Sequence, residues 1–563
     1  HTRSYSVTGV QTCALDLGFK RADEIALKIG FPYDHPYRIQ AVIMYLLLEY
    51  MNKYGDTYLE KDRLLDYALS YLNVGKDFVL DRARIAAGLG ELAFAGRIID
   101  IEGRISLGGI YHQEQTLARI IKDHAGKGGE TIDPETIRDQ IRAIEAAKGI
   151  VYTPKQHLAI AKALTAHFVI ITGGPGTGKT TIIEAITQIY ARLHAQDKLP
   201  RKAIRLAAPT GKAAKRLSEA TALEATTIHR LLGFDYEGKF AFGNHNKIDA
   251  RLIVLDEVSM LDTALAYQFF QALAPRTKLV LVGDDNQLPS VGPGQILADL
   301  IASGIIDLVK LDHIHRQAAD SQIVTLAYNI LEQDVGELAF PKDKEVWFQP
   351  AKETLCADWV CKFVKQALDD GLDLIEDIQV LVPVYKGING IDRLNELLQE
   401  RFNSRHAAHQ IAKGDKRFYF NDKVMQLVNQ PEDGVMNGDI GVVAGIIENK
   451  ELLVDFSGTQ VKYNINDFDN LTLAYAISIH KSQGSEFRCV IMPIVRAHAI
   501  MLKRKLLYTA ITRAKERLVL IGEAEAFVRG VYGYEAERKT WLGEFLRQEE
   551  QTGAANLTIE DFL

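Results

Sequence analysis

One segment of the chain has the residue types and spacing that hold a phosphate chain. Residues 173–180 read GGPGTGKT, after an apolar run at 167–172 and before a helix pattern at 181–193. Glycines let backbone N–H groups turn inward, and a helix N-terminus adds partial positive charge, so such a loop cradles phosphates. Lys179 can reach the β- and γ-phosphates, and the Thr180 hydroxyl can hold Mg²⁺. The strand, loop and helix context predicts a P-loop for ATP. The contacts expected with ATP are Gly174, Pro175, Gly176, Thr177, Gly178, Lys179, Thr180 and Thr181.

Two carboxylates follow a second apolar run. Residues 252–255 are all apolar, and Asp256 and Glu257 come directly after them. Consecutive strand residues point to opposite sides, so one carboxylate can serve Mg²⁺ while its neighbour faces the attacking water. We therefore assign Asp256 to the metal and Glu257 to activation of the water. An acidic pair in a surface turn is the alternative.

Two glutamines also suit a nucleotide site. Gln287 lies in LVGDDNQLP (281–289), where its amide can bond a γ-phosphate or the lytic water and link hydrolysis to loop movement. Gln156 lies just upstream of the first strand, and its amide can both donate to and accept from an adenine edge. A surface turn is the alternative for the first, and a glutamine without special role for the second.

Two arginines lie in or next to the second of two predicted α/β lobes. Arg316 belongs to HIHRQ (313–317) and Arg513 to YTAITRAK (508–515). A guanidinium that reaches across a cleft stabilises charge on the γ-phosphate, as an arginine finger does. The alternative is an arginine on a helix surface.

These residues need a scaffold, and the pattern predicts two α/β lobes with the nucleotide in the cleft. Strand candidates alternate with helices, which is typical of parallel sheets covered on both faces. The first series of strands is 167–172, 203–208, 251–255 and 278–282. The second is 378–382, 489–493 and 517–521, with helices near 388–401 and 502–514.

The expected organisation follows from shifts in composition. Residues 1–15 look unlike the rest and are interpreted as a non-native segment, a translated adapter scar that replaces the start of the gene. The other expected parts are a mostly helical region at 16–125, a linker at 126–150, lobe one at 151–330 with a β-hairpin insert at 233–247, and lobe two at 331–563 with a small β-barrel-like insert at about 421–470.

The helical region has helix patterns at 38–54, 62–72 and 78–95, followed by alternation around Glu102-Gly103 that predicts a hairpin. Helices before such a hairpin suggest a winged-helix-like module, which either contacts DNA or only packs. Residues 17–23 are either the end of a helix-hairpin-helix element, whose amides bind phosphate, or a plain loop that enters a helix.

The bulk composition excludes some classes. The chain has 563 residues and a net charge of −7, so nucleic-acid binding must use local basic clusters. Its four cysteines show neither metal-ligand spacing nor a disulfide framework, which favours a reducing cytoplasm. We find no membrane-span pattern.

The motifs as a set resemble those of superfamily 1 helicases. More narrowly they resemble the RecD-like family, in its long stand-alone form with an extra N-terminal region. Residues 421–426 (NDKVMQ) and 437–441 (NGDIG) also resemble that family, where they flank an SH3-like insert. The segments that carry the resemblance, in chain order, are 173–180, 208–214, 227–232, 256–260, 283–289, 478–486 and 508–515.

The resemblance implies two RecA-like lobes and an ATP- and Mg²⁺-dependent DNA helicase. It further implies 5′→3′ translocation on single-stranded DNA, a role in repair or recombination, and a duplex-splitting pin at 233–247. Gln483 and Glu486 would join the nucleotide site to the DNA track. The implied DNA contacts are Pro209, Thr210, Lys212, His229, Ser478 and His480.

The implied partners are single-stranded DNA and duplex junctions, with single-strand-binding or recombination proteins as further candidates, for a monomer that does not bind membranes. The alternative function is a nucleic-acid-stimulated ATPase that remodels RNA or nucleoprotein. A P-loop switch that is no motor is a third interpretation, against which the motifs at 478–486 and Arg513 argue.

Overall fold

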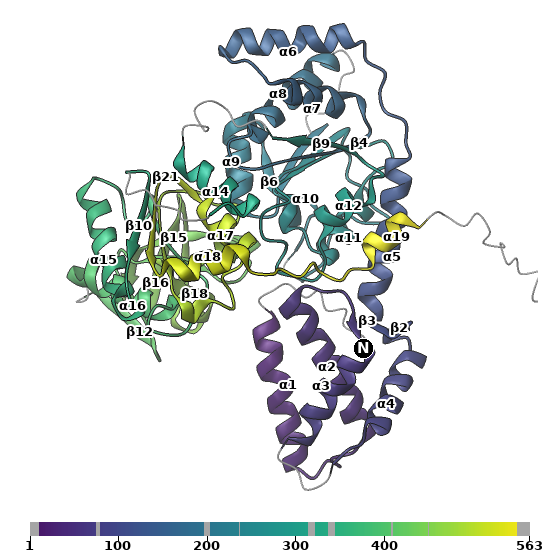
Figure 1. Ribbon diagram of the computed structural model, residues 1–563, viewed down its shortest axis with the longest axis vertical. Helices are drawn as coiled ribbons and strands as arrows, with labels where there is room; N and C mark the ends of the chain where they lie inside the picture. The colour runs from purple at the N-terminus through teal and green to yellow at the C-terminus, as the bar shows by residue number, and fades with distance from the viewer. Residues whose placement is uncertain are drawn as a thin grey trace, which may run out of the picture.

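The computed structural model describes residues 11–74, 79–195, 203–235, 237–312, 321–335, 344–406, 409–448 and 450–548. Figure 1 shows a helical N-terminal part below, a first lobe above it and a second lobe to one side. Each lobe is built on its own parallel sheet. The expected fold class, tandem RecA-like lobes with an SH3-like insert, is confirmed.

Lobe one contains a six-stranded sheet in the order β6-β5-β7-β8-β4-β9, and all its pairs are parallel. Every residue of β4, β7 and β8 is buried, because helices cover both faces. The strands are β4 (Phe168–Gly173), β5 (Ile204–Ala208), β6 (Ala225–Thr227), β7 (Leu252–Leu255), β8 (Lys278–Gly283) and β9 (Asp307–Leu311). The helices are α7 (Pro154–Thr165), α8 (Lys179–Leu193), α9 (Gly211–Thr221), α10 (Ile228–Leu231), α11 (Thr263–Ala272) and α12 (Ile296–Ser303).

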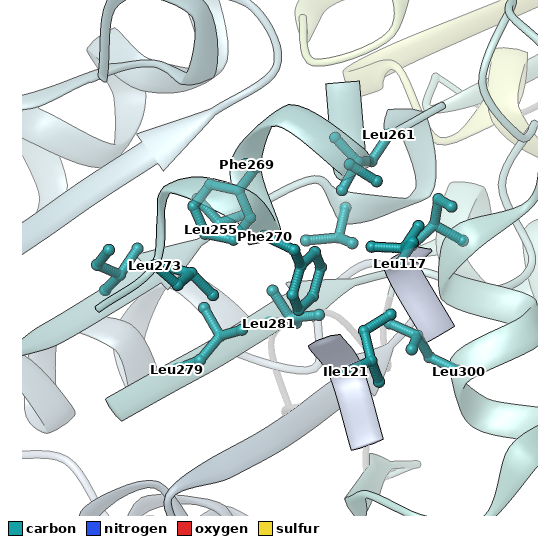
Figure 2. Packing of buried hydrophobic residues seen from close by; sticks show 14 of the residues in the cluster. Leu117, Ile121, Leu255, Leu261, Phe269, Phe270, Leu273, Leu279, Leu281 and Leu300 are labelled. Carbon is teal, nitrogen blue, oxygen red and sulfur yellow. The ribbon is translucent and has the colours of Figure 1, made fainter. Parts of the chain in front are cut away.

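Two helices from outside the expected lobe complete its cores. Helix α5 (Gly108–Ala125) places Leu117 and Ile121 in the core on one face of the sheet, beside Phe270 and Leu300 (Figure 2). Helix α6 (Pro134–Lys148) contributes three isoleucines to the core on the other face. The segment expected as a linker is therefore part of the packed lobe.

Lobe two has the strand order β10-β21-β20-β11-β19, again all parallel. Helix α14 (Gln322–Glu332) buries Leu326 and Ile330 in this lobe's core, so the boundary expected at residue 330 falls inside a helix of lobe two. The strands are β10 (Val346–Pro350), β11 (Ile378–Val382), β19 (Ala476–Ser478), β20 (Phe487–Ile494) and β21 (Ala514–Gly522). The other helices are α15 (Glu353–Asp369), α16 (Ile391–Phe402), α17 (Arg504–Ile511) and α18 (Ala524–Tyr532).

The insert in lobe two is an antiparallel sheet in the order β17-β16-β15-β14-β18, next to a two-stranded hairpin. It has its own apolar core, in which Val443, Val454 and Tyr463 are buried. The strands are β12 (Gln410–Lys413), β13 (Lys416–Tyr419), β14 (Lys423–Gln426), β15 (Ile440–Ile447), β16 (Glu451–Phe456), β17 (Thr459–Asn464) and β18 (Leu471–Leu473).

The N-terminal part matches the predicted helices and hairpin. The hairpin turns at Glu102 (φ 52°) and Gly103 (φ 77°), the left-handed pair that a two-residue turn requires. Residues 17–23 lie inside α1, so the alternative of a plain loop there is wrong; the chain between the first two helices is residues 29–35. The elements are α1 (Gln11–Lys28), α2 (Pro36–Tyr54), β1 (Leu59–Glu60), α3 (Lys61–Asn73), α4 (Arg82–Phe94), β2 (Ile98–Ile101) and β3 (Arg104–Leu107).

The end of the described chain returns to lobe one, although residues 331–563 were assigned to lobe two. Helix α19 (Leu542–Arg547) packs beside α5 and α12 (Figure 1). The buried Glu114 of α5 accepts hydrogen bonds from Thr57 Oγ1 (2.8 Å), Thr263 Oγ1 (3.1 Å) and the Trp541 backbone N–H (3.0 Å). One carboxyl thus joins the N-terminal part, lobe one and the returning segment, and its burial raises the pKa of Glu114 to about 8.

The insert at 233–247 is less regular than the expected hairpin. Its described residues include no strand, and one antiparallel bridge joins Phe234 to Phe240. Phe240 and Phe242 pack against the lobe-one core, so their side chains hold the segment against the lobe. The expectation of two paired strands is corrected to a short bridged turn.

Candidate functional site: a nucleotide cleft and a groove beside it

The loop at 173–180 has the geometry of a phosphate cradle. Gly176 (φ 73°) and Gly178 (φ 81°) adopt the left-handed conformation that favours glycine, and Gly178 caps the N-terminus of α8. Lys179 Nζ donates to the carbonyl oxygens of Gly173 (2.6 Å) and Gly174 (2.9 Å). The ammonium is therefore folded over the loop, where the phosphates of a nucleotide are expected. Thr180 and Thr181 follow in the first turn of α8, half-buried.

Gln156 is built into the support of this loop. Its Nε2 donates to the Thr177 carbonyl (2.9 Å), and its Oε1 accepts from the Thr153 backbone N–H (2.9 Å) at the start of α7. The side chain is 1% exposed. The observed role is to fix the P-loop to α7, and contact with adenine remains a prediction.

The acidic pair lies at the carboxyl end of β7, on the same sheet edge as the P-loop. Asp256 Oδ1 accepts from the Glu257 backbone N–H (2.8 Å). Burial raises the pKa of Asp256, the neighbouring Glu257 raises it further, and Lys179 opposes both. Glu257 has φ 54°, a strained conformation for a residue with a side chain, and such strain is concentrated at functional sites.

The oxygen donors at this edge fit Mg²⁺. That ion is held through one or two carboxylates together with phosphate and water. Asp256 is a buried carboxylate with a raised pKa, so a nearby cation would stabilise its ionised form. Among the described residues, no group of three or more His, Cys, Asp or Glu side chains is placed to hold a metal ion, so this fit requires nucleotide oxygens to complete the ligand set.

Three hydrogen bonds join the lobes around the loop that follows β8. Tyr508 Oη donates to Asp284 Oδ2 (2.7 Å), the Leu288 N–H donates to Thr509 Oγ1 (2.9 Å), and Gln483 Nε2 donates to the Leu288 carbonyl (2.9 Å). Gln287 is 7% exposed, and its Oε1 is buried without a hydrogen-bond partner among the described residues. An acceptor for a water molecule is thus available in the loop after β8, and the role of Gln287 at the γ-phosphate or the lytic water remains a prediction.

Arg513 is buried, with 3% of its surface exposed. Its guanidinium donates to the carbonyls of Thr509 (3.1 Å) and Ser485 (3.1 Å) and to Thr512 Oγ1 (3.4 Å). These acceptors are all neutral. Among the described residues, no carboxylate forms a direct ion pair with Arg513. Arg316 lies outside the described residues.

Glu486 links the nucleotide side to the next motif. Its carboxylate bonds Arg216 of α9 (2.5 Å) in lobe one and Lys515 (3.2 Å) in lobe two. Burial opposes ionisation, but Arg216, Lys515 and Arg513 together lower the pKa of Glu486. Arg216 also lowers the pKa of Asp256, so one arginine acts on both carboxylates.

A groove of about 470 Å³ runs between α9–α10 of lobe one and the SH3-like insert. Lys212 and His229 line it from lobe one, and Met436 and Asp439 from the insert. Burial lowers the pKa of Lys212 to about 8, against the opposing effect of Asp439, and burial also lowers the pKa of His229. His229 packs against both Phe234 and Phe240 of the bridged turn, at ring-centroid distances of 5.4 and 6.1 Å.

The other predicted DNA contacts do not line this groove. Pro209 and Thr210 follow β5, and Thr210 Oγ1 caps α9 by accepting from the Ala213 N–H (3.3 Å). Ser478 ends β19 and accepts from the Lys481 N–H (3.3 Å). Burial lowers the pKa of His480, as does the nearby Arg538.

Some residues of these sites were not predicted. Tyr508 and Asp284 belong to the motifs at 508–515 and 283–289. Their hydrogen bond depends on how the two lobes pack, which the sequence does not determine. Arg216 lies one helical turn beyond Lys212, a spacing that indicates a shared helix face but no particular partner. Asp439 lies in the NGDIG motif, and only the structure places it opposite Lys212.

Among the described residues, no helix is long and apolar enough to cross a membrane.

Four family models match the chain. An AAA domain matches residues 156–293, and a UvrD-like helicase C-terminal domain matches residues 473–521. An ATP-dependent RecD-like DNA helicase SH3 domain matches residues 394–456, and an ATP-dependent RecD2 DNA helicase HHH domain matches residues 12–58. The last match begins inside the segment 1–15 that we interpreted as non-native, so residues 12–15 belong with the N-terminal part.

Two RecA-like lobes with a P-loop at their interface define an ATP-driven motor of helicase superfamily 1. The ATP-dependent RecD2 DNA helicase of Deinococcus radiodurans is 32% identical over 550 residues, which cover 94% of this chain and 72% of the relative. The RecD subunit of the RecBCD enzyme of Mycolicibacterium smegmatis is 30% identical and covers 70% of this chain and 75% of its own length. The chain belongs to the RecD-like family of ATP-dependent DNA helicases.

Solved structures of Pif1 helicases also align with the chain. One from Bacteroides, in complex with ADP-AlF3 and single-stranded DNA, is 19% identical, with a TM-score of 0.38 over 68% of this chain and 95% of that one. Pif1 from Candida albicans is 18% identical, with a TM-score of 0.39 over 67% of this chain and 97% of that one.

Proposed function

We propose that ATP hydrolysis between the lobes drives this helicase 5′→3′ along single-stranded DNA and that duplex is split at the bridged turn 233–247. The observation that carries the coupling of hydrolysis to lobe movement is the set of three hydrogen bonds that join the loop after β8 to lobe two. When the loop after β8 moves between the ATP-bound and ADP-bound states, these bonds move lobe two with it. Packed interfaces such as this one switch between discrete arrangements rather than deform continuously. The 5′→3′ direction and the pin are inferred from the RecD-like family alone.

Each residue of the nucleotide site has a separate role in this proposal. Backbone N–H groups of 174–178 cradle the phosphates and Lys179 neutralises their charge. Glu257 orients and deprotonates the attacking water, Gln287 accepts a hydrogen bond from that water, and Arg513 and Arg316 stabilise charge on the γ-phosphate. Thr180 and Asp256 would hold Mg²⁺, which supplies charge neutralisation at the β- and γ-phosphates when bound.

The groove is proposed as part of the DNA track. Lys212 meets backbone phosphate, while Thr210, His229, Ser478 and His480 supply polar contacts and Pro209 shapes the wall. Support comes from the desolvated Lys212, whose charged form a phosphate would stabilise. Glu486, bonded to Arg216, connects movement of this track to the carboxylates of the nucleotide site, and Gln483 connects it to the loop after β8. Duplex junctions are the proposed substrate of a monomeric enzyme, in DNA repair or recombination, with single-strand-binding or recombination proteins as partners in the cytoplasm.

Steady-state ATP hydrolysis tests the proposal, measured without nucleic acid, with single-stranded DNA and with single-stranded RNA. We expect strong stimulation by DNA alone. Equal stimulation by RNA would favour a remodeller of RNA or nucleoprotein, and a healthy basal rate without stimulation would contradict the motor.

A further inference from the structure

A tyrosine that no sequence motif identifies stands over the P-loop. The position that a Cβ atom would take on Gly174 lies 2.8 Å from Tyr328 Oη and 3.0 Å from Tyr508 Oη. Both hydroxyl groups therefore touch the second residue of the loop. Tyr508 comes from α17 and Tyr328 from α14, and the two helices are neighbours in lobe two (Figure 1).

The two hydroxyl groups differ in their partners. Tyr508 Oη donates to Asp284 (2.7 Å), whereas Tyr328 Oη is buried and has no hydrogen-bond partner among the described residues. Buried polar atoms are nearly always paired, so an exception in a cleft indicates a partner that arrives during function. Burial raises the pKa of Tyr328 to about 12, so the hydroxyl remains a proton donor at neutral pH. What it lacks is an acceptor.

In the part of the chain that the structure describes, no neighbouring group accepts a hydrogen bond from Tyr328 Oη. Lys179 donates and cannot accept, and it is directed to the carbonyls of Gly173 and Gly174. Asp284 already accepts from Tyr508 and from the Asn286 N–H. A nucleotide on the P-loop would place phosphate oxygens here, at the side of the loop that faces lobe two.

We propose that Tyr328 is a further nucleotide-binding residue whose hydroxyl donates to the terminal phosphate of ATP from lobe two. This inference rests on the proposed nucleotide site at the P-loop. Helix α14 is fixed in lobe two by the buried side chains of Ile323, Leu326 and Ile330. A bond from Tyr328 to the γ-phosphate therefore ties lobe two to the presence of ATP, and it is absent with ADP.

The test compares the affinities of a non-hydrolysable ATP analogue and of ADP for the full chain. Tyr328→Phe keeps the ring and removes only the hydroxyl. We expect it to weaken the ATP analogue by roughly tenfold, the effect of one hydrogen bond to a charged group, and to leave ADP unchanged. Tyr152→Phe is the matched control, since Tyr152 Oη is also buried and unpartnered among the described residues but lies in the core of lobe one; it should change neither affinity.

Lys179→Ala, assayed for ATP hydrolysis, distinguishes failure of the proposed P-loop site from failure of the Tyr328 contact alone. If Lys179→Ala abolishes turnover and Tyr328→Phe leaves the ratio of ATP-analogue to ADP affinity at the wild-type value, the assignment of Tyr328 alone is overturned. That assignment also fails if Tyr328→Phe weakens both nucleotides equally, because the contact would then not be to the terminal phosphate. If Lys179→Ala hydrolyses ATP normally, the P-loop site and the Tyr328 contact both fail.

Discussion

The nucleotide cleft and the groove beside it are built between the same two lobes, but in opposite ways. In the cleft, direct hydrogen bonds cross from Asp284 to Tyr508 and from Leu288 to Thr509 and Gln483. In the groove, Lys212 and Asp439 face each other, yet no ion pair to Lys212 is present among the described residues. In the cleft, hydrogen bonds between protein groups join the two lobes directly, whereas the groove holds a desolvated lysine that a polyanion can pair.

This difference separates the roles of the two regions. Because the hydrogen bonds of the cleft are already formed, the protein needs little rearrangement during the chemical step, which suits a catalytic site. A buried lysine with a lowered pKa gains most from an arriving phosphate, which suits a track that must bind and release DNA. Changes in the cleft should therefore reduce turnover, and changes in the groove should reduce DNA affinity and its dependence on salt.

The largest expected effect is in the cleft. Arg513→Ala should bind ATP but slow hydrolysis by roughly 10³-fold, because the guanidinium that stabilises the γ-phosphate is lost. Single-turnover hydrolysis and nucleotide binding measured together check this. Arg517→Ala is the control, a partly exposed arginine that pairs with Asp370 on the lobe surface. Unchanged turnover in Arg513→Ala would remove its proposed finger role.

Lys179→Ala should reduce kcat by roughly 10²- to 10³-fold and leave the melting temperature near the wild-type value. The ammonium bonds only loop carbonyls in the structure, so its loss leaves the fold intact. Steady-state turnover and thermal unfolding are the measurements. Retained turnover would contradict the assignment of the P-loop as the working site.

The bridged turn should affect unwinding without affecting hydrolysis. Replacing the tip at 235–239 with a glycine-serine linker leaves Phe240 and Phe242 on the lobe-one core. We expect single-strand-stimulated ATPase to persist and duplex unwinding to fall by roughly tenfold, or about 1.4 kcal/mol. Unwinding at the wild-type rate would show that the turn is no pin.

The sequence predicted the cleft far better than the groove. Apolar runs identified the strands that end at Gly173 and Leu255, and parallel strands necessarily bring such ends to one sheet edge. Sequence cannot fix which helix covers which face, so α5, α6 and α19 were assigned outside lobe one. The groove depends on how a β insert docks against α9, which neither periodicity nor spacing determines.

In the groove, Lys212→Ala should weaken single-stranded DNA binding by about 1 kcal/mol, roughly fivefold, at every sequence tested. The slope of log affinity against log salt should fall in magnitude by about 0.7, the value for one phosphate on a single strand. Titration at several salt concentrations checks both. Lys365→Ala is the control, since Lys365 is an exposed lysine of α15 that pairs with Asp369 and does not line the groove. An unchanged slope would place Lys212 off the track.

The smallest expected effect is a pH dependence of DNA binding. With a pKa near 8, Lys212 is charged below that pH and loses its proton as the pH rises through it. Phosphate favours the charged form, so affinity should be constant near pH 7 and fall roughly threefold by pH 9. Lys212→Arg remains charged and should flatten the profile. If DNA affinity falls equally steeply with pH in the wild type and in Lys212→Arg, a group other than Lys212 is responsible for the pH dependence.

Unwinding of tailed duplexes tests most directly whether the cleft drives movement along the groove. The measurement compares 5′-tailed and 3′-tailed DNA with the same duplex, with ATP and Mg²⁺ and without them. We expect strand separation from the 5′-tailed substrate only, and only with ATP. Separation from the 3′-tailed substrate alone, or DNA-stimulated hydrolysis without separation of either, would contradict it.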